Sequence, residues 1–130
     1  MLAVTALVAA ALVVVYLGLS ARIIAHRRDV KIGVGDGGDA ALRLKIRAHG
    51  NFNEYVPLAL LLLAFAESGG AHRALVAALG AALVLARLAH AAGLSRSPGY
   101  SMGRFAGTAV TLAVLLILAV VNVVMALPRL

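Results

Sequence analysis

Two long stretches without any charged residue dominate this chain. Residues 2–21 and 105–127 contain no Asp, Glu, Lys or Arg. About 20 apolar residues in an α-helix, rising ~1.5 Å per residue, cover the ~30 Å hydrocarbon core of a bilayer. Each stretch is therefore predicted to be a transmembrane helix.

Two further stretches between them are long enough to span but carry polar residues. Residues 44–66 have a polar first half, and residues 74–94 are interrupted only by Arg87 and His90. Polar groups in lipid are costly, so these side chains must face the bundle interior, a partner subunit or the water interface. The short turn at 67–72 makes the two middle spans antiparallel. We predict an all-α integral membrane four-helix bundle, one domain over 1–130, with spans at about 2–21, 44–66, 74–94 and 105–127.

The composition agrees with a membrane protein. Hydrophobic residues make up 63% of the chain and charged residues 13%, too few to cover the surface of a soluble domain. The chain has no cysteine, so any reactive thiol must arrive with a ligand. The basic residues that give the net charge of +7 lie between the apolar runs. In these positions they determine the membrane orientation and do not indicate nucleic-acid binding.

The basic residues also predict a topology. Ten of the twelve Lys and Arg residues lie within 22–47 and 87–104, and only Arg73 and Arg129 lie elsewhere. Cytoplasmic connections carry the excess of positive charge, so both termini are expected outside the cytoplasm. No positive residue precedes the first run, which predicts a retained helix rather than a cleaved signal peptide. The glycines of 33–38 predict a flexible interhelical loop, because no strand precedes them and no Lys-Ser/Thr pair follows.

The second span carries a polar stripe at its cytoplasmic end. At 100° per residue, four polar residues fall within an arc of about 80°. These are Arg43, Arg47, Asn51 and Glu54. Tyr55 flanks the stripe, whereas Lys45 and His49 point to nearly the opposite side, toward a different helix or another subunit.

The third and fourth spans add cations at the same level. Arg87 and His90 are three residues apart and share a helix face. An arginine within an apolar span costs about 2.5–3.5 kcal/mol on insertion scales, so we expect Glu54 to pair with Arg87. Arg104 opens the fourth span. Cations that outnumber the one carboxylate favour a site for a peptide-like anion. An ion pair that only holds helices together, with interfacial arginine anchors, remains the alternative on these residues.

Four stretches of sequence resemble a known family. Residues 47–57 read RAHGNFNEYVP, 87–90 read RLAH, 20–22 read SAR and 35–38 read GDGG. These resemble the membrane-associated proteins in eicosanoid and glutathione metabolism (MAPEG), and in particular small bacterial inner-membrane members. The resemblance covers nearly the whole chain. It implies a homotrimer in a bacterial inner membrane that binds glutathione between subunits near the cytoplasmic side.

The resemblance also implies an activity and its residues. The expected reaction is glutathione-dependent transfer or peroxidation on lipophilic electrophiles, with glutathione as co-substrate and no metal. Its partners would be further copies of the chain, membrane lipids and a lipophilic second substrate. The residues expected to bind glutathione are Arg22, Arg47, His49, Asn51, Glu54, Tyr55, Arg87 and His90. Arg22 and His49 would reach it from the neighbouring subunit.

The catalytic residue implied by the family is Arg104, which would activate the thiol. Residues 95–103 are longer than in some members, so Arg96 is the alternative. His90 and Leu94 stand where some members carry tyrosines, and Phe105 stands where another carries serine. These departures argue against an eicosanoid substrate but leave the glutathione site in place.

Two other function classes apply to small membrane proteins of this kind. A non-catalytic membrane protein of the same fold, binding glutathione or lipid, stays open. A transporter is disfavoured, because the outer halves of the first and last spans offer no polar path. Asn122 is the exception there, and we expect it to form an interhelical hydrogen bond.

Overall fold

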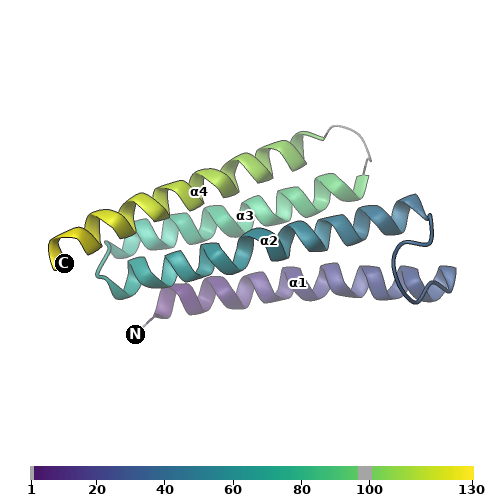
Figure 1. Ribbon diagram of the computed structural model, residues 1–130, viewed down its shortest axis with the longest axis horizontal. Helices are drawn as coiled ribbons and strands as arrows, with labels where there is room; N and C mark the ends of the chain where they lie inside the picture. The colour runs from purple at the N-terminus through teal and green to yellow at the C-terminus, as the bar shows by residue number, and fades with distance from the viewer. Residues whose placement is uncertain (1, 97–100) are drawn as a thin grey trace.

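The computed structural model describes residues 2–96 and 101–130, without the side chains of 94–96. The four α-helices of this part are α1 (Ala3–Val30), α2 (Ala40–Ser68), α3 (Arg73–Arg96) and α4 (Met102–Ala126), followed by a 3-10 turn, η1 (Leu127–Arg129). The helices run up and down side by side, with both chain ends at one end of the bundle and the α1–α2 loop at the other (Figure 1). The predicted all-α four-helix architecture is confirmed.

Three of the helices are long and apolar enough to cross a membrane. These are α1, residues Arg73–Gly93 of α3, and the segment Met102–Arg129 that contains α4. With 29 residues α2 is about 43 Å long, but its first half is polar. Hydropathy therefore supports three of the four predicted crossings.

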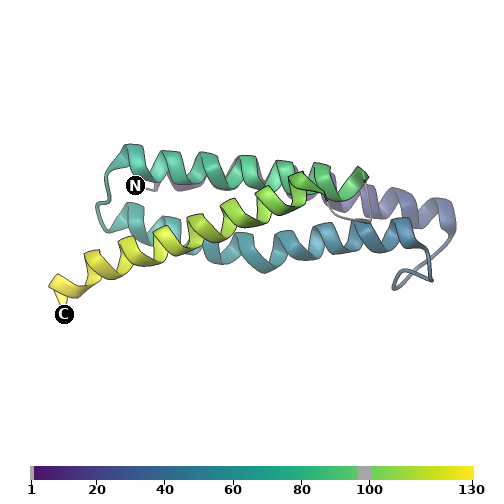
Figure 2. The ribbon, with the colours of Figure 1, turned by 90° about the horizontal axis from the view of Figure 1, so that it is seen from above.

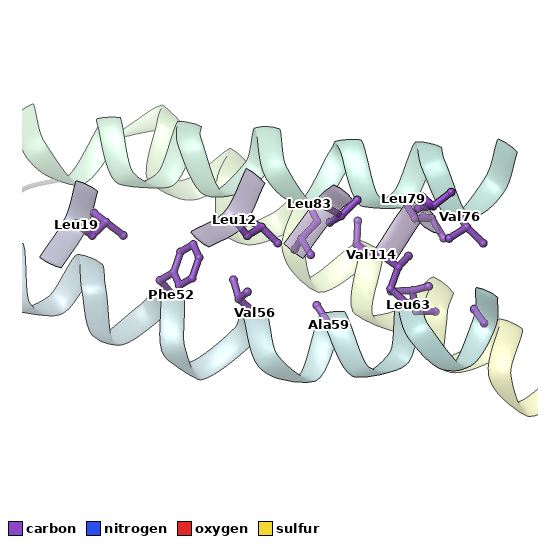
Figure 3. Close-up of a cluster of buried hydrophobic side chains, with 14 of the residues drawn as sticks. Leu12, Leu19, Phe52, Val56, Ala59, Leu63, Val76, Leu79, Leu83 and Val114 are labelled. Carbon is purple, nitrogen blue, oxygen red and sulfur yellow. The ribbon is translucent and has the colours of Figure 1, made fainter. Parts of the chain in front are cut away.

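The buried side chains repeat every three or four residues on each helix. On α2 they include Phe52, Val56, Ala59 and Leu63, and on α4 they include Val114 and Leu118. This spacing puts one apolar stripe of each helix toward its neighbours, as in coiled-coil-like bundles. Figure 3 shows the four α2 side chains and Val114 of α4 meeting Leu12 of α1 and Leu83 of α3 along the bundle axis.

Helix α4 crosses the bundle obliquely, from α3 at its beginning to α2 at its end (Figure 2). The crossing begins where Gly107 lies against Ala86 of α3, and a Cβ at Gly107 would come within 2.5 Å of the Ala86 carbonyl oxygen. Only glycine permits that approach. At the other end, Asn122 Nδ2 donates to the carbonyl oxygen of Leu62 on α2 at 2.9 Å, which confirms the expected interhelical bond.

The first helix is longer than the predicted span and is held at both ends. It continues to Val30, because no glycine or proline follows until Gly33 and because Arg27 and Arg28 suit the negative end of the helix dipole. Its start has no cap of its own. Instead, Glu67 of α2 accepts bonds from the backbone N–H of Val4 and Thr5, at 2.9 and 2.7 Å. The sequence predicted only a turn there.

Candidate functional site

The polar stripe of α2 lies on an outward face of the single chain. Arg47 and Glu54 form a loose ion pair across it, with Arg47 Nη1 at 3.8 Å from Glu54 Oε1. Their side chains are 65% and 51% exposed. The pair is accessible to a ligand or to another copy of the chain.

Arg87 of α3 lies behind this stripe and is almost completely buried, with 2% of its surface exposed. Its Nη1 donates to Asn51 Oδ1 at 2.8 Å, and its guanidinium carbon lies 6.0 Å from the centre of the Tyr55 ring. The prediction that Arg87 pairs with Glu54 is therefore wrong. Asn51 and Glu54 differ by about 60° around the helix, which turns Asn51 toward α3 and Glu54 outward.

Two nitrogens of that guanidinium have no hydrogen-bond acceptor in the described part of the chain. Both Nε and Nη2 of Arg87 are buried without a hydrogen-bond partner among the described residues. A buried unsatisfied donor costs about 1–3 kcal/mol, and more when charged. The single chain thus keeps a partly satisfied cation directly behind an exposed polar stripe.

The opposite side of α2 faces α1 of the same chain. His49 Nε2 lies 3.1 Å from Ser20 Oγ, and the centre of its ring lies 4.9 Å from that of the Tyr16 ring, with the two planes tilted by 41°. Lys45 Nζ lies 2.8 Å from His26 Nδ1, also on α1. Of the two alternatives left open by the sequence, contact with a different helix is the one seen in the chain. Tyr16, Ser20 and His26 were not anticipated, because nothing local in the sequence signals a cross-helix contact.

The remaining predicted residues belong to α1, α3 and α4. Arg22 is exposed and makes no hydrogen bond or ion pair with the described part of the chain. His90 is buried between α3 and α4, where a Cβ on Gly107 would come within 2.8 Å of it. Arg104 lies in the first turn of α4, with its backbone nitrogen beside Gly93 of α3. The side chains of Leu94 and Arg96 fall outside the described residues.

Charges of the α1–α2 loop are neutralised locally. Arg43, the first residue of the predicted stripe, binds Asp36 and not the cluster, with Nε at 2.5 Å from Asp36 Oδ2. That bond holds the pKa of Asp36 below its ordinary value. Asp39 caps α2 by accepting from the N–H of Leu42, which lowers its pKa in the same way. The candidate site therefore begins at Arg47.

One chain assembles five of the expected residues from two helices: Arg47, Asn51, Glu54 and Tyr55 of α2, and Arg87 of α3. They offer a guanidinium fork, a carboxylate, an amide and a phenol ring, which together match the groups of a small zwitterionic peptide. Within the described part of the chain, no three His, Asp or Glu side chains gather closely enough to hold a metal ion.

The arrangement agrees with comparison to known proteins. The model of the MAPEG family matches residues 5–124, which contain α2 and α3 whole and most of α1 and α4. The chain belongs to the MAPEG family. A MAPEG chain with three helices suited to span a bilayer is a membrane protein.

The relatives of this MAPEG chain carry a location in their names and no reaction. Inner membrane protein YecN from Escherichia coli strain K12 is 38% identical over 68 residues. The protein of the same name from Escherichia coli O6:H1 has the same identity over the same length. The match covers 52% of this chain and 52% of each relative, so the chain spans about half the length of the curated relatives it matches.

Proposed function

We propose that this MAPEG protein is a glutathione-dependent membrane enzyme, a transferase or peroxidase that directs the glutathione thiol at lipophilic electrophiles. The observation that carries the proposal is the Arg47–Glu54 stripe with Arg87 behind it. Structural ion pairs of a membrane helix turn inward, whereas this pair faces outward and the unsatisfied cation lies within. Such an arrangement favours an anionic ligand over a helix-binding role.

Each group on the stripe has a chemical counterpart in glutathione. The Arg47 guanidinium suits one of the two carboxylates, because the planar fork binds a carboxylate with two parallel hydrogen bonds. Glu54 suits the ammonium group, and the amide of Asn51 suits a peptide bond. In this proposal, the positive charge of Arg87, which lies behind Asn51 and Tyr55, stabilises the negative end of the ligand.

The proposal includes a homotrimer in which α2 also crosses the membrane. The exposed Arg47–Glu54 pair of α2 would be costly if it faced lipid. We therefore infer that a second copy of the chain covers this face of α2. Arg22 and His49, which do not join the cluster of their own chain, would then serve the cluster of the neighbouring subunit. The domain is taken as residues 1–130.

Thiol activation is assigned to Arg104. It lies in the first turn of α4, at the end of the bundle where the stripe lies. Its charge is retained on partial burial because the guanidinium stays protonated. A cation beside the sulfur favours the thiolate, which is the nucleophile. The second substrate is lipophilic and reaches the sulfur from the bilayer. Arg96 is the alternative residue for this role.

The proposed location is the inner membrane of a bacterium, with both termini outside the cytoplasm. The names of the relatives and the positions of the basic residues support it. A reporter enzyme fused after Leu130 tests the orientation. Activity of a reporter that works only in the cytoplasm would contradict it.

Conjugation of glutathione to a generic aryl halide by the detergent-purified protein is the test of function. We expect turnover by the wild type and its loss in Arg47→Ala. Arg43→Ala is the matched control, because Arg43 lies on the same face of α2 but binds Asp36. Glutathione binding without turnover would establish the alternative, a non-catalytic binding protein. Absence of both binding and turnover would overturn the proposal.

A further inference from the structure

An apolar groove of about 560 Å³ lies between α1 and α3 at the end of the bundle that holds both termini. Its walls are small and apolar, and include Val4, Val8 and Ala11 of α1 and Ala77, Ala81 and Leu85 of α3. The volume lies within the range of about 300–1,000 Å³ that is typical of small-molecule pockets. Both walls belong to helices suited to span a membrane, so the groove opens toward lipid.

The one charged side chain in the lining is Arg73, at the start of α3. It is exposed and forms no ion pair with any residue that the structure describes. The nearest candidate partner along the chain, Glu67, uses both carboxylate oxygens on the start of α1. Its Oε1 accepts from Val4 N, and its Oε2 accepts from the N–H and hydroxyl of Thr5. Arg73 thus remains available to an external anion.

The length of the groove corresponds to one leaflet of a bilayer. Its α3 wall runs from Arg73 to Leu85, which is about 18 Å along a helix. Half of a ~30 Å hydrocarbon core is ~15 Å. Arg73, at the first residue of the span, therefore lies at headgroup depth, and the apolar walls lie at the depth of the acyl chains.

We infer that this groove is a specific site for an anionic phospholipid of the leaflet that holds both termini. One acyl chain lies between α1 and α3, and the phosphate accepts hydrogen bonds from Arg73. Guanidinium groups bind phosphate with two parallel hydrogen bonds, and a basic residue at the membrane surface favours anionic lipids. The inference rests on the spans and the groove and is independent of glutathione.

Charge argues against a second copy of the chain as the occupant. The chain has five acidic side chains, of which Asp29, Asp36 and Asp39 lie around the α1–α2 loop at the far end of the bundle and Glu54 lies at the middle of α2. Subunits in one membrane share an orientation, so a neighbour would offer only its own Glu67 at the level of Arg73, and that carboxylate is already engaged. A lipid phosphate supplies the missing anion.

Native mass spectrometry of the full chain tests the inference, after release from vesicles of equal parts phosphatidylglycerol and phosphatidylcholine. We expect the wild type to retain phosphatidylglycerol about five-fold over phosphatidylcholine, the ratio for about 1 kcal/mol per basic residue near the membrane surface. Ala77→Phe fills the groove and should abolish retention of both lipids. Arg73→Gln should retain a lipid but lose the headgroup preference.

Two matched variants control for nonspecific effects. Ala113→Phe adds the same ring to an exposed site of α4, and Arg129→Gln removes a cation at the same end of the bundle. Both should behave as wild type. Ala81→Leu, a smaller filling change, covers a folding failure of Ala77→Phe.

Three results would overturn the inference: no lipid retained by the wild type, equal retention of both lipids, or unchanged retention in folded Ala77→Phe or Ala81→Leu. A change of oligomeric state in either variant, without bound lipid in the wild type, would assign the groove to a second copy instead.

Discussion

Asn51 and Arg87 provide a test of whether the buried cation serves stability or ligand binding. Asn51 Oδ1 is the acceptor for Arg87 Nη1, and the other two buried nitrogens of that guanidinium have none among the described residues. The two substitutions Asn51→Ala and Arg87→Met remove opposite sides of one hydrogen bond. We expect Asn51→Ala to lower the free energy of unfolding and Arg87→Met to leave it unchanged or raise it.

The magnitudes follow from the contacts. Asn51→Ala removes a hydrogen bond to a charged group, worth about 1.5–3 kcal/mol, and leaves the guanidinium wholly unpaired. We expect the free energy of unfolding to fall by about 2–3 kcal/mol. Arg87→Met loses the same bond and a contact with Tyr55 of about 0.5–2 kcal/mol. It also removes two unsatisfied donors at about 1–3 kcal/mol each, so its stability should equal or exceed that of the wild type.

Unfolding in mixed micelles of increasing dodecyl sulfate content measures both changes. Protein concentration must be held constant, because assembly stabilises the fold by mass action. The double variant should lie nearer to the wild type than Asn51→Ala does, since it no longer contains a stranded cation. Arg87→Met should meanwhile weaken glutathione binding at least about ten-fold, or about 1.4 kcal/mol. A loss of stability in Arg87→Met as large as in Asn51→Ala would refute the reasoning.

Three further predictions address the site and the bundle end. Arg104→Ala should bind glutathione but lose the thiolate absorbance near ~240 nm, with turnover falling about 10²-fold, as difference spectroscopy and initial rates would show. Glu54→Gln should lose glutathione affinity in calorimetry while the protomer loses at most about 1 kcal/mol of stability, because its pair with Arg47 is exposed. The Thr5 hydroxyl and the N–H groups of α1 hold the pKa of Glu67 below its ordinary 4.5. Its capping bonds are therefore complete above pH 4.5 and are lost as pH falls through the lowered pKa, so the protection of the Thr5 amide against hydrogen exchange, relative to the intrinsic rate at each pH, should fall there.

Each of these has a result that would contradict it. Thiolate formed at neutral pH by Arg104→Ala would move the role to Arg96. A Glu54→Gln protein with unchanged glutathione affinity would remove that carboxylate from the site. For the cap, Glu67→Gln is the control, since it keeps the shape of the side chain without the titration. If the Thr5 amide loses the same protection against hydrogen exchange in Glu67→Gln as pH falls, the Glu67 carboxylate is not the cause.

The sequence was sufficient to predict the helices but not their rotations. Apolar run lengths predict where each span lies, and the structure places α2 and α3 within a few residues of the predicted ranges. The predicted partner of Arg87, Glu54, was wrong because the partner depends on how α2 turns toward α3. Two residues on one stripe, Asn51 and Glu54, can face different neighbours. The cap that Glu67 forms on α1 joins residues more than 60 positions apart, which no local pattern signals.

Stability alone would favour the opposite distribution of hydrogen-bond and ion-pair partners between α2 and α3. The ion pair that water could solvate, Arg47 with Glu54, is exposed, whereas Arg87, which most needs acceptors, is buried with one. A bundle optimised for its own stability would exchange Arg87 for an apolar residue, since the same space could be filled without desolvating a charge. Its presence behind Asn51 and Tyr55 is accounted for if the missing acceptors arrive from outside the chain. That requirement connects the polar half of α2 to the ligand proposed for it.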